Sequence, residues 1–120
     1  MQSTISKALT LLSVISMVTA TDYQTITVNT YYFANCSSGE ISVNDQVYEG
    51  ECTGTDTWPL KSILAYQSSG LCSDTSTSPV LYVYSETFCA GDPVASFDVT
   101  DEETCFELDD TVQGLMVECV

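Results

Sequence analysis

Residues 80–91, VLYVYSETFCAG, carry the two signals that decide the fold of this chain. β-branched and aromatic residues fill the first positions, which is typical of a half-buried strand. Ala90-Gly91-Asp92-Pro93 has the composition of a turn, and residues 94–99 resume the apolar alternation. The stretch therefore predicts a strand, a turn and a return strand.

An earlier segment has the same layout at a shift of fifty-three residues. The matched pairs are Tyr31 with Tyr84, Cys36 with Cys89, Asp45 with Asp98, Glu49 with Glu102, and Cys52 with Cys105. In each copy the two cysteines stand sixteen residues apart and a glycine follows the first of them. We expect an internal repeat over 23–66 and 80–119, joined by a connector at 67–79 that is rich in Ser and Thr.

Short apolar runs predict the remaining strands. Alternation over 23–33 and 41–47 predicts strands in the first half, and 106–108 and 115–117 predict two short strands in the second. Two equivalent four-strand units indicate an all-β fold, in which two duplicated Greek-key-like halves pack as a small sandwich stapled by three disulfides.

The segment around Trp58 and Pro59 leaves two interpretations open. Leu60, Ile63 and Leu64 have helical spacing after a helix-start pattern, whereas the repeat predicts a strand at 62–66. We favour the strand, with a short helix as the alternative. Trp58 is expected in the core or as a plug at one end of the sheets, the alternative being an exposed ligand platform.

The first twenty residues have the pattern of a signal peptide. Lys7 precedes an apolar run over 8–18, and Val18-Thr19-Ala20 supplies the small residues of a cleavage site. The run is shorter than the roughly twenty residues that span a bilayer. We therefore expect a single domain at 21–120 that is secreted, extracellular and not inserted in a membrane.

Six cysteines and no histidine favour disulfides over a zinc site, since no C-x-x-C pair is present. With the connector counted in the first half, each half holds three cysteines, so neither half can pair all of its own. The equal sixteen-residue spacing favours local bonds Cys36–Cys52 and Cys89–Cys105, which leave Cys72–Cys119 as the cross-link.

The charge balance restricts the partners. The chain has seventeen acidic and two basic residues, a formal net charge of −15. Nucleic acid and anionic membrane surfaces require a basic footprint that this chain lacks. Extracellular proteins, glycans and calcium remain as partners, and solubility alone is the simplest role for the charge. The oligomeric state does not follow from the sequence.

Three further groups of residues are candidates for function. Asn35-Cys36-Ser37 is an N-glycosylation sequon on an expected turn. Alternation prevents all the tyrosines of the two aromatic strands from facing inward, so Tyr32 and Tyr82 are expected on an interaction surface. An acidic group supplies oxygen ligands of the type that calcium takes. Its members are Asp101, Glu102, Glu103, Glu107, Asp109 and Asp110.

The hairpin Tyr84…Cys89…Gly91 resembles the first hairpin of a βγ-crystallin-type Greek key, which has an aromatic, a large residue five on and a glycine seven on. Asp109-Asp110 leading to Gly114 resembles the later part of that motif. The resemblance implies two Greek keys in one domain and calcium loops. Gln113 and Lys61 occupy the positions where the family has a hydroxyl ligand, and Lys61 argues against calcium in the first half.

The cysteine layout is also similar to that of small secreted cysteine-rich proteins of social amoebae and fungi. Without histidine there is no imidazole base, so catalysis is not expected, and calcium is the one cofactor considered. We expect a non-enzymatic extracellular binding module. The alternatives are a secreted effector, toxin or signalling protein, or a calcium-binding βγ-crystallin-like structural module.

Overall fold

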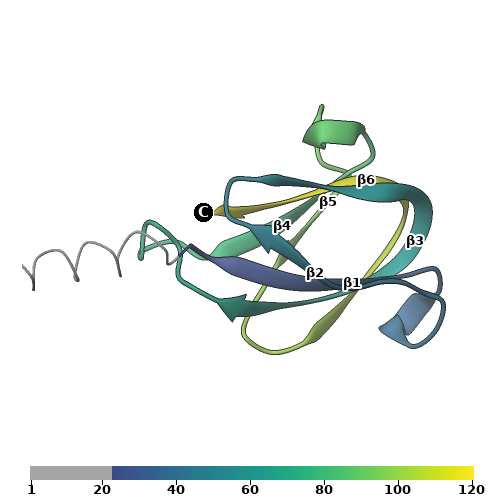
Figure 1. The fold of residues 1–120 in the computed structure, drawn as a ribbon, viewed down its shortest axis with the longest axis horizontal. Coiled ribbons are helices and arrows are strands. Elements are labelled where there is room, and N and C mark those ends of the chain that lie inside the picture. Colours follow the sequence, from purple (N-terminus) through teal and green to yellow (C-terminus); the bar gives the residue numbers. More distant parts are fainter. Residues whose placement is uncertain (1–22) are drawn as a thin grey trace, which may run out of the picture.

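The computed structural model describes residues 23–120, apart from the side chains of residues 55–58. The expected leader at 1–20 and the expected role of the Trp58 side chain lie outside this description. The described part contains six strands and two 3₁₀ turns (Figure 1). They are β1 (Thr25–Tyr31), η1 (Ala34–Cys36), β2 (Glu40–Tyr48), β3 (Cys52–Ser69), β4 (Pro79–Tyr84), η2 (Thr87–Cys89), β5 (Ala95–Asp98) and β6 (Thr104–Cys119).

The six strands form one antiparallel sheet in the order β2-β1-β3-β6-β4-β5. In each half the third strand returns to pair with the first strand, and β3 and β6 then pair at the centre. A shift of fifty-three residues places η1 on η2 and β1 on β4. The all-β prediction is confirmed.

Two details differ from the expected pair of four-strand units. Residues 106–108 and 115–117 belong to one long strand, β6, so each half has three strands and all six share one sheet. The strand expected at 62–66 is confirmed as part of β3, and the helical alternative at this segment is wrong. Strand pairing on both sides of this segment overrides its helical spacing, because β3 pairs with both β1 and β6.

The long strands β3 and β6 bend the sheet over a common core. Register shifts interrupt their pairing between Gly54 and Trp58 and between Leu60 and Ser62, and such irregularities increase local twist. The bend brings the turn after β2 next to the end of β6 (Figure 1), where the Gly50 N–H donates to the Val117 carbonyl at 2.8 Å.

Both halves contribute to the single hydrophobic core. Tyr31 and Tyr84, which precede the two 3₁₀ turns, are buried beside it. Fully burying a valine, leucine or isoleucine side chain contributes about 1.5–3 kcal/mol. The core residues are Ile26, Val28, Val47, Leu60, Ile63, Ala65, Leu81, Val83, Val99, Val112, Leu115 and Val117.

Three disulfides join the first half of the chain to the second. The bonds are Cys36–Cys105, Cys52–Cys89 and Cys72–Cys119. Only Cys72–Cys119 agrees with the expected pairing; the local bonds Cys36–Cys52 and Cys89–Cys105 are wrong. The reason lies in the antiparallel β3–β6 pair. Each central strand begins beside the end of the other, so the first cysteine of each strand lies near the 3₁₀ turn of the opposite half.

Three disulfides are typical of an oxidising, extracellular-type compartment. Within residues 23–120, no helix has the length and apolarity needed to cross a membrane.

Candidate functional site

The two 3₁₀ turns have the same unusual backbone. Asn35 and Cys36 in η1 have φ angles of 70° and 49°, and Phe88 and Cys89 in η2 have φ angles of 60° and 53°. Asparagine tolerates this left-handed region, whereas a bulky side chain there is a conformational outlier. Phe88 nevertheless occupies the position that Asn35 holds in the first half, and its ring is 90% exposed.

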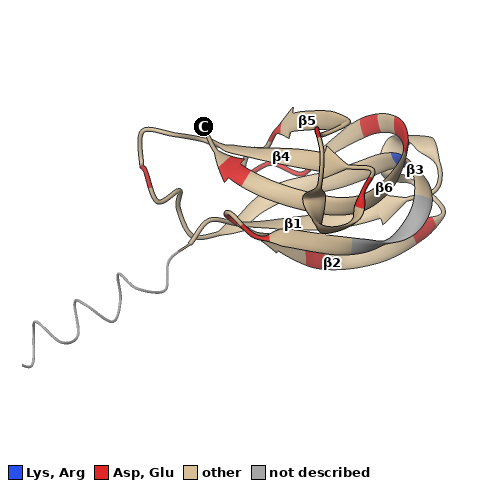
Figure 2. Cartoon of the chain, turned by 90° about the horizontal axis from the view of Figure 1, so that it is seen from above, with Lys and Arg blue, Asp and Glu red and all other residues tan. Residues whose placement is uncertain are grey.

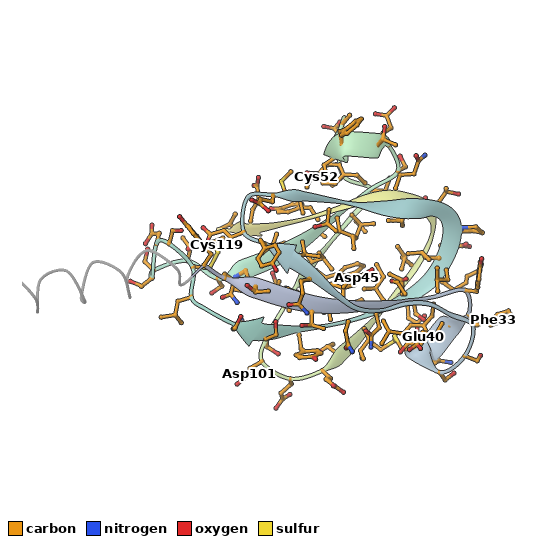
Figure 3. All side chains as sticks on the ribbon, in the orientation of Figure 1. Phe33, Glu40, Asp45, Cys52, Asp101 and Cys119 are labelled. Carbon is orange, nitrogen blue, oxygen red and sulfur yellow. A yellow bond between two sulfur atoms is a disulfide. The ribbon has the colours of Figure 1, made fainter. Side chains whose placement is uncertain are left out.

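Side-chain hydrogen bonds and a disulfide hold η1 in place. The Ser62 hydroxyl donates to the Phe33 carbonyl at 2.6 Å and accepts from the Cys36 N–H at 2.9 Å. The Asn35 N–H donates to Glu107 Oε1 at 2.9 Å. Figure 3 shows Phe33 at the edge of the molecule beyond η1, and the residue is 60% exposed.

The support beneath η2 is different. Gln113 Nε2 donates to the Ser85 carbonyl at 3.1 Å, and the disulfide Cys52–Cys89 ties the turn to the start of β3. A Cβ atom at Gly114 would stand 3.0 Å from Cys89 Sγ, so β6 passes closely under the turn at a position where a side chain would crowd the disulfide. The base of η2 is therefore fixed while Phe88 points into solvent.

A hollow of about 230 Å³ lies beside Phe88. The described residues that line it are apolar or neutral. The lining residues are Cys52, Gly54, Thr87, Phe88 and Gln113. Phe88 and this hollow form one surface, which we call the Phe88 surface.

A larger hollow of about 410 Å³ lies at the turn between β2 and β3. Two tyrosines and two glutamates line it, namely Tyr23, Tyr48, Glu49 and Glu51. Glu51 and Cys52 are consecutive residues, so the turn that lines this hollow continues directly into the Phe88 surface.

Acidic residues greatly outnumber basic residues in the described part of the chain (Figure 2). Within residues 23–120 the only ion pair joins Lys61 Nζ to Asp109 Oδ1 at 2.8 Å. Hydrogen bonds from Ser76, from its hydroxyl and its backbone N–H, lower the pKa of the exposed Asp74. Burial, followed by the charges of Glu118 and Tyr82, raises the pKa of Tyr84.

The acidic candidates for calcium lie on two different elements. Asp101, Glu102 and Glu103 are exposed in the turn between β5 and β6, whereas Asp109 and Asp110 are exposed within β6. Among the described residues, no three acidic or other ligating side chains come close enough together to hold a metal ion. Glu107 accepts a hydrogen bond from the Asn35 N–H in η1. Lys61 donates to Asp109, and Gln113 donates to the Ser85 carbonyl.

The other predicted residues occupy varied positions. Tyr32 and Tyr82 are half-buried, so each leaves part of its ring at the surface, while Asn35 is exposed at the tip of η1. Sequence reasoning missed Phe88, Tyr23 and Tyr48. Phe88 carried a detectable signal, because the fifty-three-residue shift aligns it with Asn35 in a turn.

Comparisons with protein-family models, with curated proteins and with solved structures find no match to the chain.

Proposed function

We propose that the chain is a secreted, non-enzymatic binding module that recognises an extracellular protein through the Phe88 surface. The observation that carries the proposal is the exposure of Phe88, 90%, in a left-handed conformation. Asn35 occupies the equivalent position in η1, so the same turn forms without an aromatic ring.

The energetic cost of this arrangement supports a role in recognition. A non-glycine residue in the left-handed region costs about 1–2 kcal/mol, and the solvent-exposed ring recovers little of it through burial. Strained residues cluster at functional sites. Exposed aromatic side chains are the residues that most often dominate protein–protein binding energy.

Rigidity of the turn supports the same conclusion. The bond Cys52–Cys89 and the hydrogen bond from Gln113 to the Ser85 carbonyl hold η2 in place before any partner binds. A backbone turn that is already held in place loses less conformational entropy on binding. The strongly acidic surface around it favours a basic partner, and a receptor on another cell would make the module an effector.

The test compares the mature chain, residues 21–120, with Phe88→Asn. Fluorescently labelled protein is applied to cultured cells and bound label is measured, with Phe33→Asn as a control that removes an exposed ring from the opposite turn. We expect Phe88→Asn to reduce the binding affinity at least about thirtyfold, since hot-spot truncation costs about 2 kcal/mol or more, and Phe33→Asn to retain binding.

Unfolding of Phe88→Asn provides the second readout. Asparagine relieves the left-handed strain, so the free energy of unfolding should rise by about 0.5–1 kcal/mol. Retained binding by Phe88→Asn would contradict the proposal, as would binding that survives protease treatment of the cells, because the latter would place the target in a glycan.

A further inference from the structure

We infer that the hollow lined by Tyr23, Tyr48, Glu49 and Glu51, here called the ammonium hollow, binds the side-chain ammonium group of a lysine on a partner protein. The inference rests on the proposed function in one respect, namely that the lysine belongs to an extracellular partner protein. The ammonium hollow itself is a separate site from Phe88.

Backbone contacts hold the walls of the ammonium hollow in place. The Glu49 N–H donates to the Gln24 carbonyl at 3.0 Å, next to Tyr23, and the Gly50 N–H donates to the Val117 carbonyl at 2.8 Å. Gly50 has a φ of 78°, which turns the chain sharply between the two glutamates. Both glutamates consequently line the same hollow.

The side chains supply the two features that recognise an organic cation. Tyr23 and Tyr48 are 60% and 45% exposed, so their rings are accessible to a ligand. Glu49 Oε1 accepts from the Ser73 N–H and hydroxyl, both at 3.2 Å, which orients its carboxylate. The Glu51 carboxylate has no hydrogen bond or ion pair to any described residue. Aromatic faces beside carboxylates attract alkylammonium groups through cation–π and ionic attraction.

Other ligand classes fit the ammonium hollow less well. The described residues form no group of three or more metal ligands, so a hard cation would lack its oxygen shell. Anions are repelled by the two carboxylates, and a neutral apolar ligand would desolvate them without compensation. An ammonium group on an apolar stem satisfies both the acids and the tyrosines.

The size of the hollow and the charge of the chain identify the source of the ammonium. About 410 Å³ exceeds the volume of an ammonium ion and leaves room for the methylene stem of lysine. The expected mature chain has one lysine, Lys61, and this residue is paired with Asp109. A second copy of the chain is therefore a poor donor, and a different, basic protein is the expected partner.

The experiment is an NMR titration of the mature chain with N-acetyl-lysine methylamide, with the neutral N-acetyl-norleucine methylamide as the matched probe. The lysine probe should cause saturable shifts at residues 48–51, and the norleucine probe should leave them unchanged. Glu51→Gln and Tyr48→Leu should each weaken binding of the lysine probe about threefold.

The repeat provides a charge-matched control. Glu102→Gln removes the same charge from the turn between β5 and β6, where the fifty-three-residue shift aligns Asp101 with Tyr48. This variant should keep the affinity within about twofold. Equal weakening by Glu51→Gln and Glu102→Gln would overturn the inference by reducing it to net charge, and so would equal shifts with the norleucine probe.

A third variant separates this inference from the proposed function. Phe88→Asn should leave the lysine titration unchanged, because Phe88 does not line the ammonium hollow. A loss of cell binding with an intact titration supports both claims, whereas an absent titration with Phe88-dependent cell binding overturns the ammonium hollow alone.

Discussion

Single residues with left-handed backbone determine where this chain can turn. Gly39, Gly50, Gly70 and Gly91 have φ angles between 71° and 78°, and five non-glycine residues among 23–120 share the region. Asn35 and Phe88 have equivalent positions in the repeat, but asparagine tolerates the left-handed conformation better than phenylalanine does. The Phe88 side chain therefore carries a conformational cost in the folded chain that Asn35 largely avoids.

Three glycines separate the effects of backbone strain and steric overlap. A Cβ atom at Gly70 would overlap the Tyr23 carbonyl, whereas Gly50 has the same φ sign with no atom within 4 Å, and Gly54 has neither constraint. We expect Gly54→Ala to change the free energy of unfolding by less than about 0.5 kcal/mol. Gly50→Ala should lower it by about 1–2 kcal/mol, and Gly70→Ala by more than Gly50→Ala.

Urea unfolding of the three alanine variants measures this order. A Gly70→Ala variant as stable as Gly50→Ala would show that the segment before β1 moves freely, and would contradict the close approach of Tyr23 to Gly70. That result would also remove one fixed wall of the ammonium hollow.

At the scale of elements, local pattern identified the strands but not their extent. The alternation of 80–85 and the repeat correctly predicted β4 and the strand at 62–66. The apolar pattern predicted two short strands where the structure has the single strand β6, because Asp109 and Asp110 interrupt that pattern. These two acids lie where the central pair bends and are exposed, so they are tolerated within a continuous strand.

The attachment of η1 to β3 depends on one hydroxyl group. Ser62 is fully buried and bonds to both Phe33 and Cys36, so Ser62→Ala leaves one carbonyl and one N–H without this partner. We expect Ser62→Ala to lower the free energy of unfolding by about 1–3 kcal/mol. Ser68 is the matched control on the same strand, since its exposed hydroxyl makes one bond of 3.2 Å to the Thr25 carbonyl.

Chemical denaturation of both serine variants tests this attachment. Ser68→Ala should cost less than about 1 kcal/mol. Equal costs for the two variants would contradict a special role of Ser62 in fixing η1.

At the scale of the whole molecule, the repeat predicted the number of bonds between the halves incorrectly. Equal spacing suggested local bonds, yet all three disulfides cross between the halves. The spacing of cysteines along the chain gives only the length of the loop that a local bond would close. Which cysteines pair depends on the antiparallel arrangement of β3 and β6. Tyr48, Glu49 and Glu51 lie in one turn, but only the fold brings Tyr23 to that turn, so the ammonium hollow had no sequence motif.

Crossed disulfides also explain how a small acidic domain stays folded. Closing a long loop by a disulfide constrains the unfolded chain by roughly 3–4 kcal/mol. The expected mature chain has seventeen acids and one base, a charge of 1 − 17 = −16, and the resulting self-repulsion opposes compactness. The bonds Cys36–Cys105 and Cys52–Cys89 brace the central pair from both ends and fix the turn that presents Phe88.

Cleavage at Lys61 tests this crossed bracing most directly. The mature chain is unfolded in urea with thiols blocked, cut after its single lysine, and analysed by mass spectrometry without reduction. Residues 21–61 carry Cys36 and Cys52, and residues 62–120 carry the other four cysteines. The structure predicts that the two fragments remain joined as one species that separates only on reduction. Two separate fragments before reduction would contradict it, because that result requires the local bond Cys36–Cys52.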